Sequence, residues 1–288
     1  MRRMIMIVSF LPATLLASHW GSGLSVTTDD RDITDCSQLR VTIDGEPAAR
    51  AQEAVPLGNV RSLTVRAPRN GGIHVIGSDS GRYEVTACKA AAMDASLNDI
   101  RVRVNGNELT GDGPDDSRWV LYFLVRAPRG ANLDLDAHNG PISIRNVNGT
   151  VGAHAVNGPI SARNVDGTVN LETTNGPISI YGGSGTAKLN ATNGPISVNL
   201  RGDSWNGSID ARTQNGPMSL RIPSTFRSGV VVESDGHGPV SCRAEACRQA
   251  KRTWDDEDNR RIELGSGPTV VHLSTVNGPV SVREREEE

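Results

Sequence analysis

The segment that decides the fold is Asn139-Gly140-Pro141-Ile142-Ser143, because the chain repeats it. The motif, Asn-Gly-Pro followed by Ile, Met or Val and then Ser, begins again at Asn157, Asn175, Asn193, Asn215 and Asn277. A variant of it begins with His237. The first four copies are 18 residues apart, the next two steps are 22 residues each, and the last is 40. Repetition at a regular period is typical of proteins built from stacked, similar units.

Half-copies of the motif lie between the full copies, at Asn148, Asp166 and Gly183, so the basic unit has about nine residues. After each Pro, apolar and polar residues alternate, as expected of a strand with one buried face. Four residues before each of the six copies that begin with Asn, the same position is apolar. It is occupied by Leu135, Ala153, Leu171, Leu189, Ala211 and Leu273.

These patterns predict an all-β fold, a single-stranded β-helix-like solenoid with coils of 18–22 residues and parallel, in-register strands. A β-meander or a sandwich would also show a turn about every nine residues. Stacking explains the column of identical residues better. We expect each motif Asn to lie at a corner and to bond to the next coil or to local backbone, and the Asn-Gly pair to supply positive φ. A calcium-binding β-roll needs Asp in every turn and only Asp166 fits, so no metal is expected.

The domain organisation that we predict has four parts. Residues 1–17 are a signal peptide, 18–38 an N-terminal segment, 39–130 a degenerate β section, and 131–285 the regular solenoid with a loop insert at about 243–261. Val-Arg-Ala-Pro-Arg occurs at both 65–69 and 125–129, which indicates that the same architecture begins early. A short helix is expected within Ala90–Leu97. Strands are expected at Leu39–Ile43, Leu63–Arg66, Ile73–Ile76, Tyr83–Ala87, Ile100–Val104 and Trp119–Val125.

An exported protein is predicted from the N-terminus and the cysteines. Arg2 and Arg3 precede a short apolar run, the pattern of a secretory signal, and the run is too short for a transmembrane helix. Four cysteines in an exported chain indicate two disulfides rather than a zinc site. They allow three pairings. Cys242 with Cys247 is a natural local pair, which leaves Cys36 with Cys88.

Composition narrows the function classes. The net charge is −3, which argues against nucleic acid as a partner, since phosphate binding needs a basic excess. Only 3% of the residues are aromatic, so the core must be aliphatic and thin rather than a deep ligand pocket. We expect no cofactor and find no catalytic motif. Asp203 and Asp210 are the acidic residues within the repeats that could converge, although simple surface solvation explains them as well.

The repeats also predict a candidate binding site. The residue six positions after the first residue of each motif belongs to one column, and the residue four positions after it belongs to a second. The first column is Arg145, Arg163, Tyr181, Asn199, Arg221, Arg243 and Arg283. The second is Ser143, Ser161, Ser179, Ser197, Ser219, Ser241 and Ser281. If the Ile side faces inward, both columns face solvent. Stacked like charges repel, so our hypothesis is a ladder for an anionic glycan, a lipid head group or an acidic protein. The alternative is that Arg only solubilises this face.

The Asn-Gly-Pro-Ile-Ser units, the Val-Arg-Ala-Pro-Arg segments and the signal peptide resemble a bacterial β-strand-repeat family of unknown function that carries an adhesin label and is related to auto-transporter-adhesin head domains. The resemblance covers roughly residues 36–283 and implies a β-helix-like solenoid with no catalytic residue. We therefore expect an exported, non-enzymatic adhesin-like protein with a structural or binding role in the cell envelope.

Two other function classes stay open at this stage. One is a carbohydrate-active β-helix enzyme resembling a polysaccharide lyase or a glycosidase, for which a cleft of convergent carboxylates would be the sign. The other is an accessory protein of envelope signalling. The sequence leaves the ligand, the compartment outside the cytoplasm and the oligomeric state open.

Overall fold

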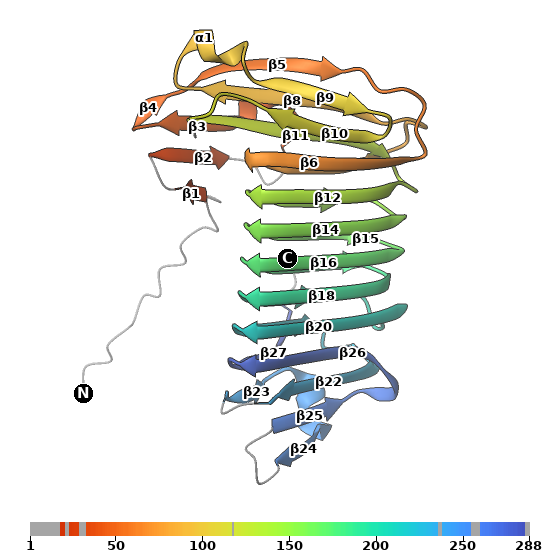
Figure 1. The fold of residues 1–288 in the computed structure, drawn as a ribbon. Coiled ribbons are helices and arrows are strands. Elements are labelled where there is room, and N and C mark those ends of the chain that lie inside the picture. Colours follow the sequence, from red (N-terminus) through yellow and green to blue (C-terminus); the bar gives the residue numbers. More distant parts are fainter. Residues whose placement is uncertain are drawn as a thin grey trace, which may run out of the picture.

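The computed structural model describes residues 18–20, 23–28, 33–116, 118–235, 238–254 and 260–285. The predicted signal peptide (1–17), His237 and the acidic run 255–258 therefore lie outside the described residues. Within the described ranges the chain is all-β, with large parallel sheets (Figure 1). The helical segments are the short helix α1 (Asp94–Leu97), as expected, and the 3-10 turns η1 (Cys36–Gln38) and η2 (Glu245–Gln249).

Three sheets account for the strands of the described residues. The four-stranded sheet contains β1 (Ser18–Trp20), β2 (Leu24–Thr28), β3 (Leu39–Ile43) and β4 (Glu46–Pro47). The twelve-stranded sheet contains, in spatial order, β24 (Lys251–Trp254), β25 (Arg260–Leu264), β22 (Ser228–Ser234), β26 (Ser266–Asn277), β20 (Gly207–Asn215), β18 (Gly185–Asn193), β16 (Thr168–Asn175), β14 (Thr150–Asn157), β12 (Asn132–Asn139), β6 (Ser62–Asn70), β10 (Glu108–Asp112) and β9 (Arg101–Asn105). The eleven-stranded sheet contains β23 (Val240–Cys242), β27 (Val280–Glu284), β21 (Met218–Ile222), β19 (Ile196–Asn199), β17 (Ile178–Gly183), β15 (Ile160–Val165), β13 (Ile142–Arg145), β7 (Ile73–Ser78), β11 (Trp119–Pro128), β8 (Glu84–Ala91) and β5 (Ala49–Val55).

From β12 to β21 the chain alternates between the two large sheets (Figure 1). We call two consecutive strands, one in each sheet, a repeat unit. Each unit pairs with the next in parallel and in register, so that Ile142 lies beside Ile160 and Ile160 beside Ile178. The six strands expected between residues 39 and 125 are confirmed as β3, β6, β7, β8, β9 and β11.

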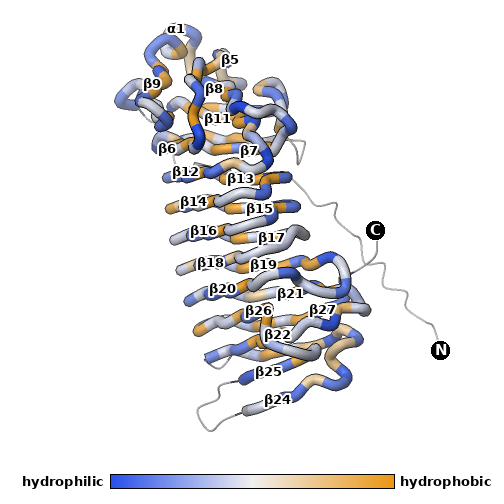
Figure 2. The backbone as a smooth tube through the Cα atoms, turned by 90° about the vertical axis from the view of Figure 1, so that its right-hand side faces the viewer, coloured by the Kyte–Doolittle hydropathy of each residue, from blue (hydrophilic) through white to orange (hydrophobic). Residues whose placement is uncertain are grey.

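The core lies between the two large sheets and is mostly aliphatic through the repeats, with Trp205 and Phe226 as buried aromatic members. Along the strands of the repeat units, buried apolar residues alternate with more exposed ones, which the colours of Figure 2 follow. The apolar column from Leu135 to Leu273 is buried throughout. Because the side chains of a strand alternate between its two faces, burying the Leu column and the Ile column leaves the Ser and Arg positions facing outward.

The motif corner carries a continuous ladder of asparagine side chains. The Nδ2 of Asn157 donates to the Oδ1 of Asn139 at 2.9 Å, and Asn175 repeats this bond to Asn157 at 2.9 Å. The ladder continues through Asn193, Asn215 and Asn277. At its other end Asn139 donates to Asn70, at 3.4 Å, a member that the motif search missed. Asn70-Gly71-Gly72-Ile73 is the degenerate signal for it.

The reason for the motif glycine differs from our prediction. The motif asparagines are the last residues of strands and none has a positive φ. Among the motif glycines Gly140 has a positive φ, of 157°, which is close to extended, and the others have none. Instead, a Cβ built on Gly176 would lie 2.2 Å from the carbonyl oxygen of Gly158. Gly194 stands in the same relation to Gly176, at 1.9 Å. The stacked corners approach so closely that only glycine fits, so close approach and not the left-handed conformation selects it.

Left-handed residues occur at the opposite corner, at or near the ends of strands of the eleven-stranded sheet. Asn146 and Asn164 have φ of 53° and 50°, and Gly182 takes the same place with 63°. Asparagine tolerates this region better than other side chains because it bonds locally. The two asparagines also bond to each other, at 3.3 Å.

The order of the units in space departs from their order in the sequence. The last strand of the twelve-stranded sheet, β26, lies between β20 and β22, and β27 likewise lies between β21 and β23. Asn277 therefore stacks on Asn215. The C-terminal copy has the Asn that continues the ladder, whereas the copy at 237 has His in that place. The copy with intact ladder chemistry takes the interior position.

A second inversion occurs at the other end, where β6 and β7 lie between the unit of β10 and β11 and the unit of β12 and β13. The two Val-Arg-Ala-Pro-Arg segments are therefore not equivalent. Val65 lies on the twelve-stranded sheet beside Leu135, and Val125 lies on the eleven-stranded sheet beside Val75. Their shared sequence reflects strands with similar alternation, and not the same place in a repeat.

The predicted loop insert at about 243–261 is also corrected. It begins with η2 and continues as β24 and β25, which pair with each other antiparallel and extend the twelve-stranded sheet beyond β22. Ile262 and Leu264 are buried there. The apolar residues of β25 cover the open end of the core, which a stack of parallel strands would otherwise expose.

The four-stranded sheet forms a second, smaller core against the outer side of β8 and β11. Leu24, Val26 and Val41 pack there with Val120 and Tyr122. Because β11 is buried on both faces, its sequence is a continuous apolar run rather than an alternating one. The disulfide between Cys36 and Cys88 joins the two parts across 52 residues.

Candidate binding surface

The outer face of the eleven-stranded sheet carries the Ser and Arg columns side by side. The register places Ser143 beside Ser161 and Arg145 beside Arg163. Tyr181 and Asn199 follow in the Arg column. Arg221 and Arg283 come next. Arg243 follows Arg283, because its backbone N–H bonds to the carbonyl oxygen of Val282. In space the last two members are therefore exchanged relative to their order in the sequence.

Two arginines outside the column, Arg201 and Arg285, fill the gap at Tyr181. The column residue Arg163 also contributes, since its guanidinium carbon lies 4.8 Å from the centroid of the Tyr181 ring. That of Arg201 lies 4.3 Å from it and that of Arg285 lies 5.3 Å from it. The Nη2 of Arg285 also donates to the Tyr181 hydroxyl at 2.9 Å. Positive charge is thus continuous along the face where the column itself has Tyr and Asn.

Sequence reasoning missed both of these arginines. Arg201 lies in the longer connection after β19, where the step between motifs grows from 18 to 22 residues, and that change was a usable signal. Arg285 is 104 residues from Tyr181, and nothing in the sequence indicated that the two would be in contact. It arrives because β27 is inserted beside β21, after which the N–H of Arg285 bonds to the carbonyl oxygen of Ile222 at 2.8 Å.

We call this surface the basic stripe. It consists of Arg145, Arg163, Arg201, Arg221, Arg243, Arg283 and Arg285. With the exception of Arg145, none of these guanidinium groups has a carboxylate of a described residue within 4.0 Å. The charges of the other six arginines are therefore not compensated by ion pairs within the described part of the chain.

The outer face of the twelve-stranded sheet is the opposite case. Arg66 contacts Glu108, Asp134 and Asp136 there, at 2.9, 3.3 and 3.1 Å. Arg212 pairs with Asp210. Arg66 is adjacent to carboxylates on the two neighbouring strands and Arg212 to one on its own strand, so in both cases the charges compensate each other.

A second charged cluster lies where the inserted strand β26 meets its neighbours on that face. The ring nitrogens of His272 lie 3.2 Å from Asp210 and 2.8 Å from Glu233. Arg261 contacts Glu233 and Glu263, and its hydrogen bond lowers the pKa of Glu263. The charges of this cluster are therefore engaged with one another.

The acidic pair considered from the sequence is not brought together. Asp203 accepts a hydrogen bond from Thr225 in the loops beside the eleven-stranded sheet. Asp210 belongs to the twelve-stranded sheet and pairs with His272 and Arg212. Within the described ranges, no group of three or more His, Cys, Asp or Glu side chains is placed to hold a metal ion.

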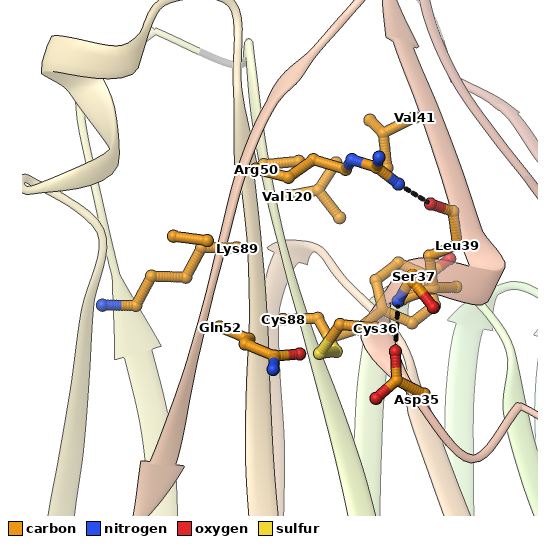
Figure 3. A pocket seen from close by; sticks show the side chains of 13 residues that line it. Asp35, Cys36, Ser37, Leu39, Val41, Arg50, Gln52, Cys88, Lys89 and Val120 are labelled. Carbon is orange, nitrogen blue, oxygen red and sulfur yellow. Dashed lines mark hydrogen bonds between the residues drawn. A yellow bond between two sulfur atoms is a disulfide. The ribbon is translucent and has the colours of Figure 1, made fainter.

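The cysteines form two disulfides in the structure, Cys36–Cys88 and Cys242–Cys247. The first lines a hollow of about 340 Å³ between the four-stranded sheet and the eleven-stranded sheet (Figure 3). Its floor includes Val41 and Val120. Arg50 reaches across it to the carbonyl oxygen of Leu39, at 3.0 Å. The guanidinium is thus already engaged, which distinguishes this hollow from the basic stripe.

Comparisons with known proteins give structural likeness only. No model of a protein family matches the chain, and no curated protein matches it. A "putative cell adhesion protein" from Clostridium sporogenes is similar over 83% of this chain and all of its own, with 10% identity and a TM-score of 0.31. A "putative adhesin" from Bacteroides fragilis covers 82% of this chain and 97% of its own, with 13% identity and a TM-score of 0.38. Likenesses this distant carry no argument about function.

Among the helices of the described residues, none has the length and apolar character needed to cross a lipid bilayer.

Proposed function

We propose that this protein is an exported, non-enzymatic β-solenoid of the cell envelope, adhesin-like in character, that binds an anionic glycan through the basic stripe. The observation that carries the proposal is the contrast between the two outer faces. On the twelve-stranded sheet Arg66, Arg212 and Arg261 are paired with carboxylates. On the eleven-stranded sheet Arg163, Arg221 and Arg283 stand in a column with no such partner among the described residues.

The chemistry of the stripe fits a linear polyanion. Guanidinium groups bind carboxylate, sulfate and phosphate groups with paired hydrogen bonds. The strands of a sheet are about 4.8 Å apart, so a chain lying along the stripe meets cations at a regular spacing. The adjacent Ser column presents hydroxyls to the same chain, as the 2.8 Å contact between Ser197 and Ser219 shows that these side chains share one face.

Export is supported by the two disulfides, because such bonds persist in oxidising compartments outside the cytoplasm. The solenoid is supported by the alternation of the chain between two parallel sheets and by the side-chain ladder at the corner. A non-enzymatic role is supported by the pairing of the carboxylates on the twelve-stranded sheet, which engages groups that a glycosidase would keep for substrate.

The test is retention on a polyanion. We would replace Arg221, Arg243 and Arg283 with Gln and measure the affinity for heparin and for a polyuronate at low salt. Three exposed charge contacts of about 0.5 kcal/mol each predict a roughly tenfold weakening. The matched control replaces Arg61, Lys188 and Arg252, three exposed basic residues outside the stripe, with Gln. Equal weakening in both variants would show that only net charge matters and would refute the proposal.

A further inference from the structure

We infer that Tyr181 and the three arginines around it form a discrete site for a phosphate monoester carried by the glycan, an inference that rests on the proposed function of the basic stripe. The site consists of Arg163, Arg201, Arg285 and Tyr181. The three guanidinium carbons lie between 4.3 and 5.3 Å from one ring centroid. Elsewhere on the stripe the arginines follow one another at strand spacing, one in each repeat unit.

The structure holds this cluster in place before any ligand arrives. Arg285 is fixed twice, by its backbone bond to Ile222 and by its side-chain bond to the Tyr181 hydroxyl. Arg201 folds over the end of β17, where its Cδ lies 3.3 Å from the position of a Cβ on Gly182. The absence of a side chain at that position makes room for Arg201. Donors fixed in advance lose less entropy when they bind a ligand.

The charge of the cluster selects the class of ligand. Three cations surround one uncharged ring, and no described carboxylate lies within ion-pair distance of them. A phosphate monoester carries nearly two negative charges at neutral pH and has three acceptor oxygens. A sulfate ester or a uronate carries one. Because the attraction scales with the product of the charges, the cluster favours the phosphate monoester over both.

Tyr181 is the positioning residue of the site. Its ring lies beside all three guanidinium groups, and its hydroxyl accepts the bond from Arg285. Cation–π attraction to the ring offsets part of the repulsion between the arginines. In Tyr181→Phe the ring stays and the hydroxyl is lost, so we expect an intermediate loss of phosphate affinity. Tyr181→Leu removes both and should lose most of it.

The experiment is calorimetric titration of the full mature chain at constant ionic strength. The probes are inorganic phosphate, glucose 6-phosphate, glucose 6-sulfate and glucuronate. We expect glucose 6-phosphate to bind at least about tenfold more tightly than the sulfate or the uronate at pH 7.5. Its affinity should fall towards pH 5 as the phosphate takes up a proton near pH 6, while sulfate binding stays level. Equal binding of all probes, or binding of none, overturns the inference.

Variants locate the site and separate its failure from that of the proposed function. Arg201→Gln with Arg285→Gln should weaken phosphate binding about tenfold or more. Arg221→Gln with Arg283→Gln, a matched pair on the same stripe, should change it less than twofold. If the phosphate probes fail while the stripe variants still lose heparin, the proposed function stands without this site. If heparin binding is insensitive to the stripe, the proposed function fails first.

One control addresses the acidic residues that follow Arg285 in the sequence, Glu286, Glu287 and Glu288. Replacing all three with Gln leaves the arginine cluster intact. Phosphate binding by the unmodified chain supports the inference whether or not this variant binds more tightly. Binding that occurs only in the variant would overturn it, because the cluster would then already have its counter-ions within the chain.

Discussion

Replacing Gly176 with Ala should destabilise the stack more than its small size implies. Gly176 follows Asn175 of the ladder, and a Cβ on it would lie 2.2 Å from the carbonyl oxygen of Gly158 in the neighbouring unit. The nearest atom is backbone, so no side chain can rotate away. Contacts of Cβ atoms below 3.0 Å essentially do not occur, so the two units must separate by about 0.8 Å at this corner.

The magnitude follows from the bonds that cross this corner. The N–H of Gly158 donates to Asn175 at 3.0 Å, and the side chain of Asn175 donates to Asn157 at 2.9 Å. A separation of about 0.8 Å would carry both beyond hydrogen-bond distance. Two lost bonds at about 1 kcal/mol each, with about 1–3 kcal/mol for overpacking, give a loss of about 3–5 kcal/mol in the free energy of unfolding.

The assay is urea denaturation followed by circular dichroism, with both disulfides intact. Gly81→Ala is the matched control, since nothing lies within 4 Å of a Cβ at Gly81 and its φ is not in the left-handed region. That substitution should change stability by less than about 1 kcal/mol, in either direction. If the two variants unfold at the same urea concentration, close approach is not what selects the motif glycine, and our account of the repeat is wrong.

Three further predictions concern stability. His74 is buried, and desolvation lowers its pKa to about 4. The unfolded chain takes up a proton at this histidine near pH 6.5, whereas the folded chain does so only near pH 4. The free energy of unfolding should therefore fall by up to about 3 kcal/mol between pH 6.5 and pH 4. His74→Phe should remove this pH dependence in denaturation curves measured across the range. Asn175→Ala removes two bonds of the ladder and should cost about 2 kcal/mol in urea denaturation, whereas Ser208→Ala, an exposed site on β20 of the same sheet, should cost almost nothing. Removing the Cys36–Cys88 disulfide, whose cysteines are 52 residues apart, should cost about 4 kcal/mol, because it closes a long loop of the unfolded chain. Removing Cys242–Cys247, with a separation of 5, should cost about 2 kcal/mol. An equal loss of stability in thermal denaturation would contradict this account from chain entropy.

The periodic features were predictable because they are local and repeated. Leu135 and Leu171 occupy one buried column because a period of 18 residues returns the chain to the same point of the next unit. The Ser and Arg columns follow from the same register. Asn70 was missed because its motif reads Asn-Gly-Gly-Ile, without the Pro that defined the search.

The physical role of the motif glycine was not predictable from the dipeptide. Asn-Gly in a sequence indicates a turn with positive φ, and that conformation occurs at the other corner, at Asn146 and Asn164. At the motif corner the restriction is the carbonyl oxygen of the neighbouring unit. A single unit does not contain that atom, so the reason for the glycine exists only in the stack.

The sequence by itself determined the strands of the regular repeats, their alternation, the in-register columns and the cysteine spacing that favoured the pairs found in the structure. Only the tertiary structure decided which unit neighbours which. Every repeat unit presents a similar edge of backbone donors and acceptors, so local sequence does not distinguish stacking in chain order from insertion of the last unit. That insertion places β27 beside β21 and carries Arg285 to Tyr181. The cluster that we propose as a phosphate site is therefore a product of the order of stacking, which no single repeat encodes.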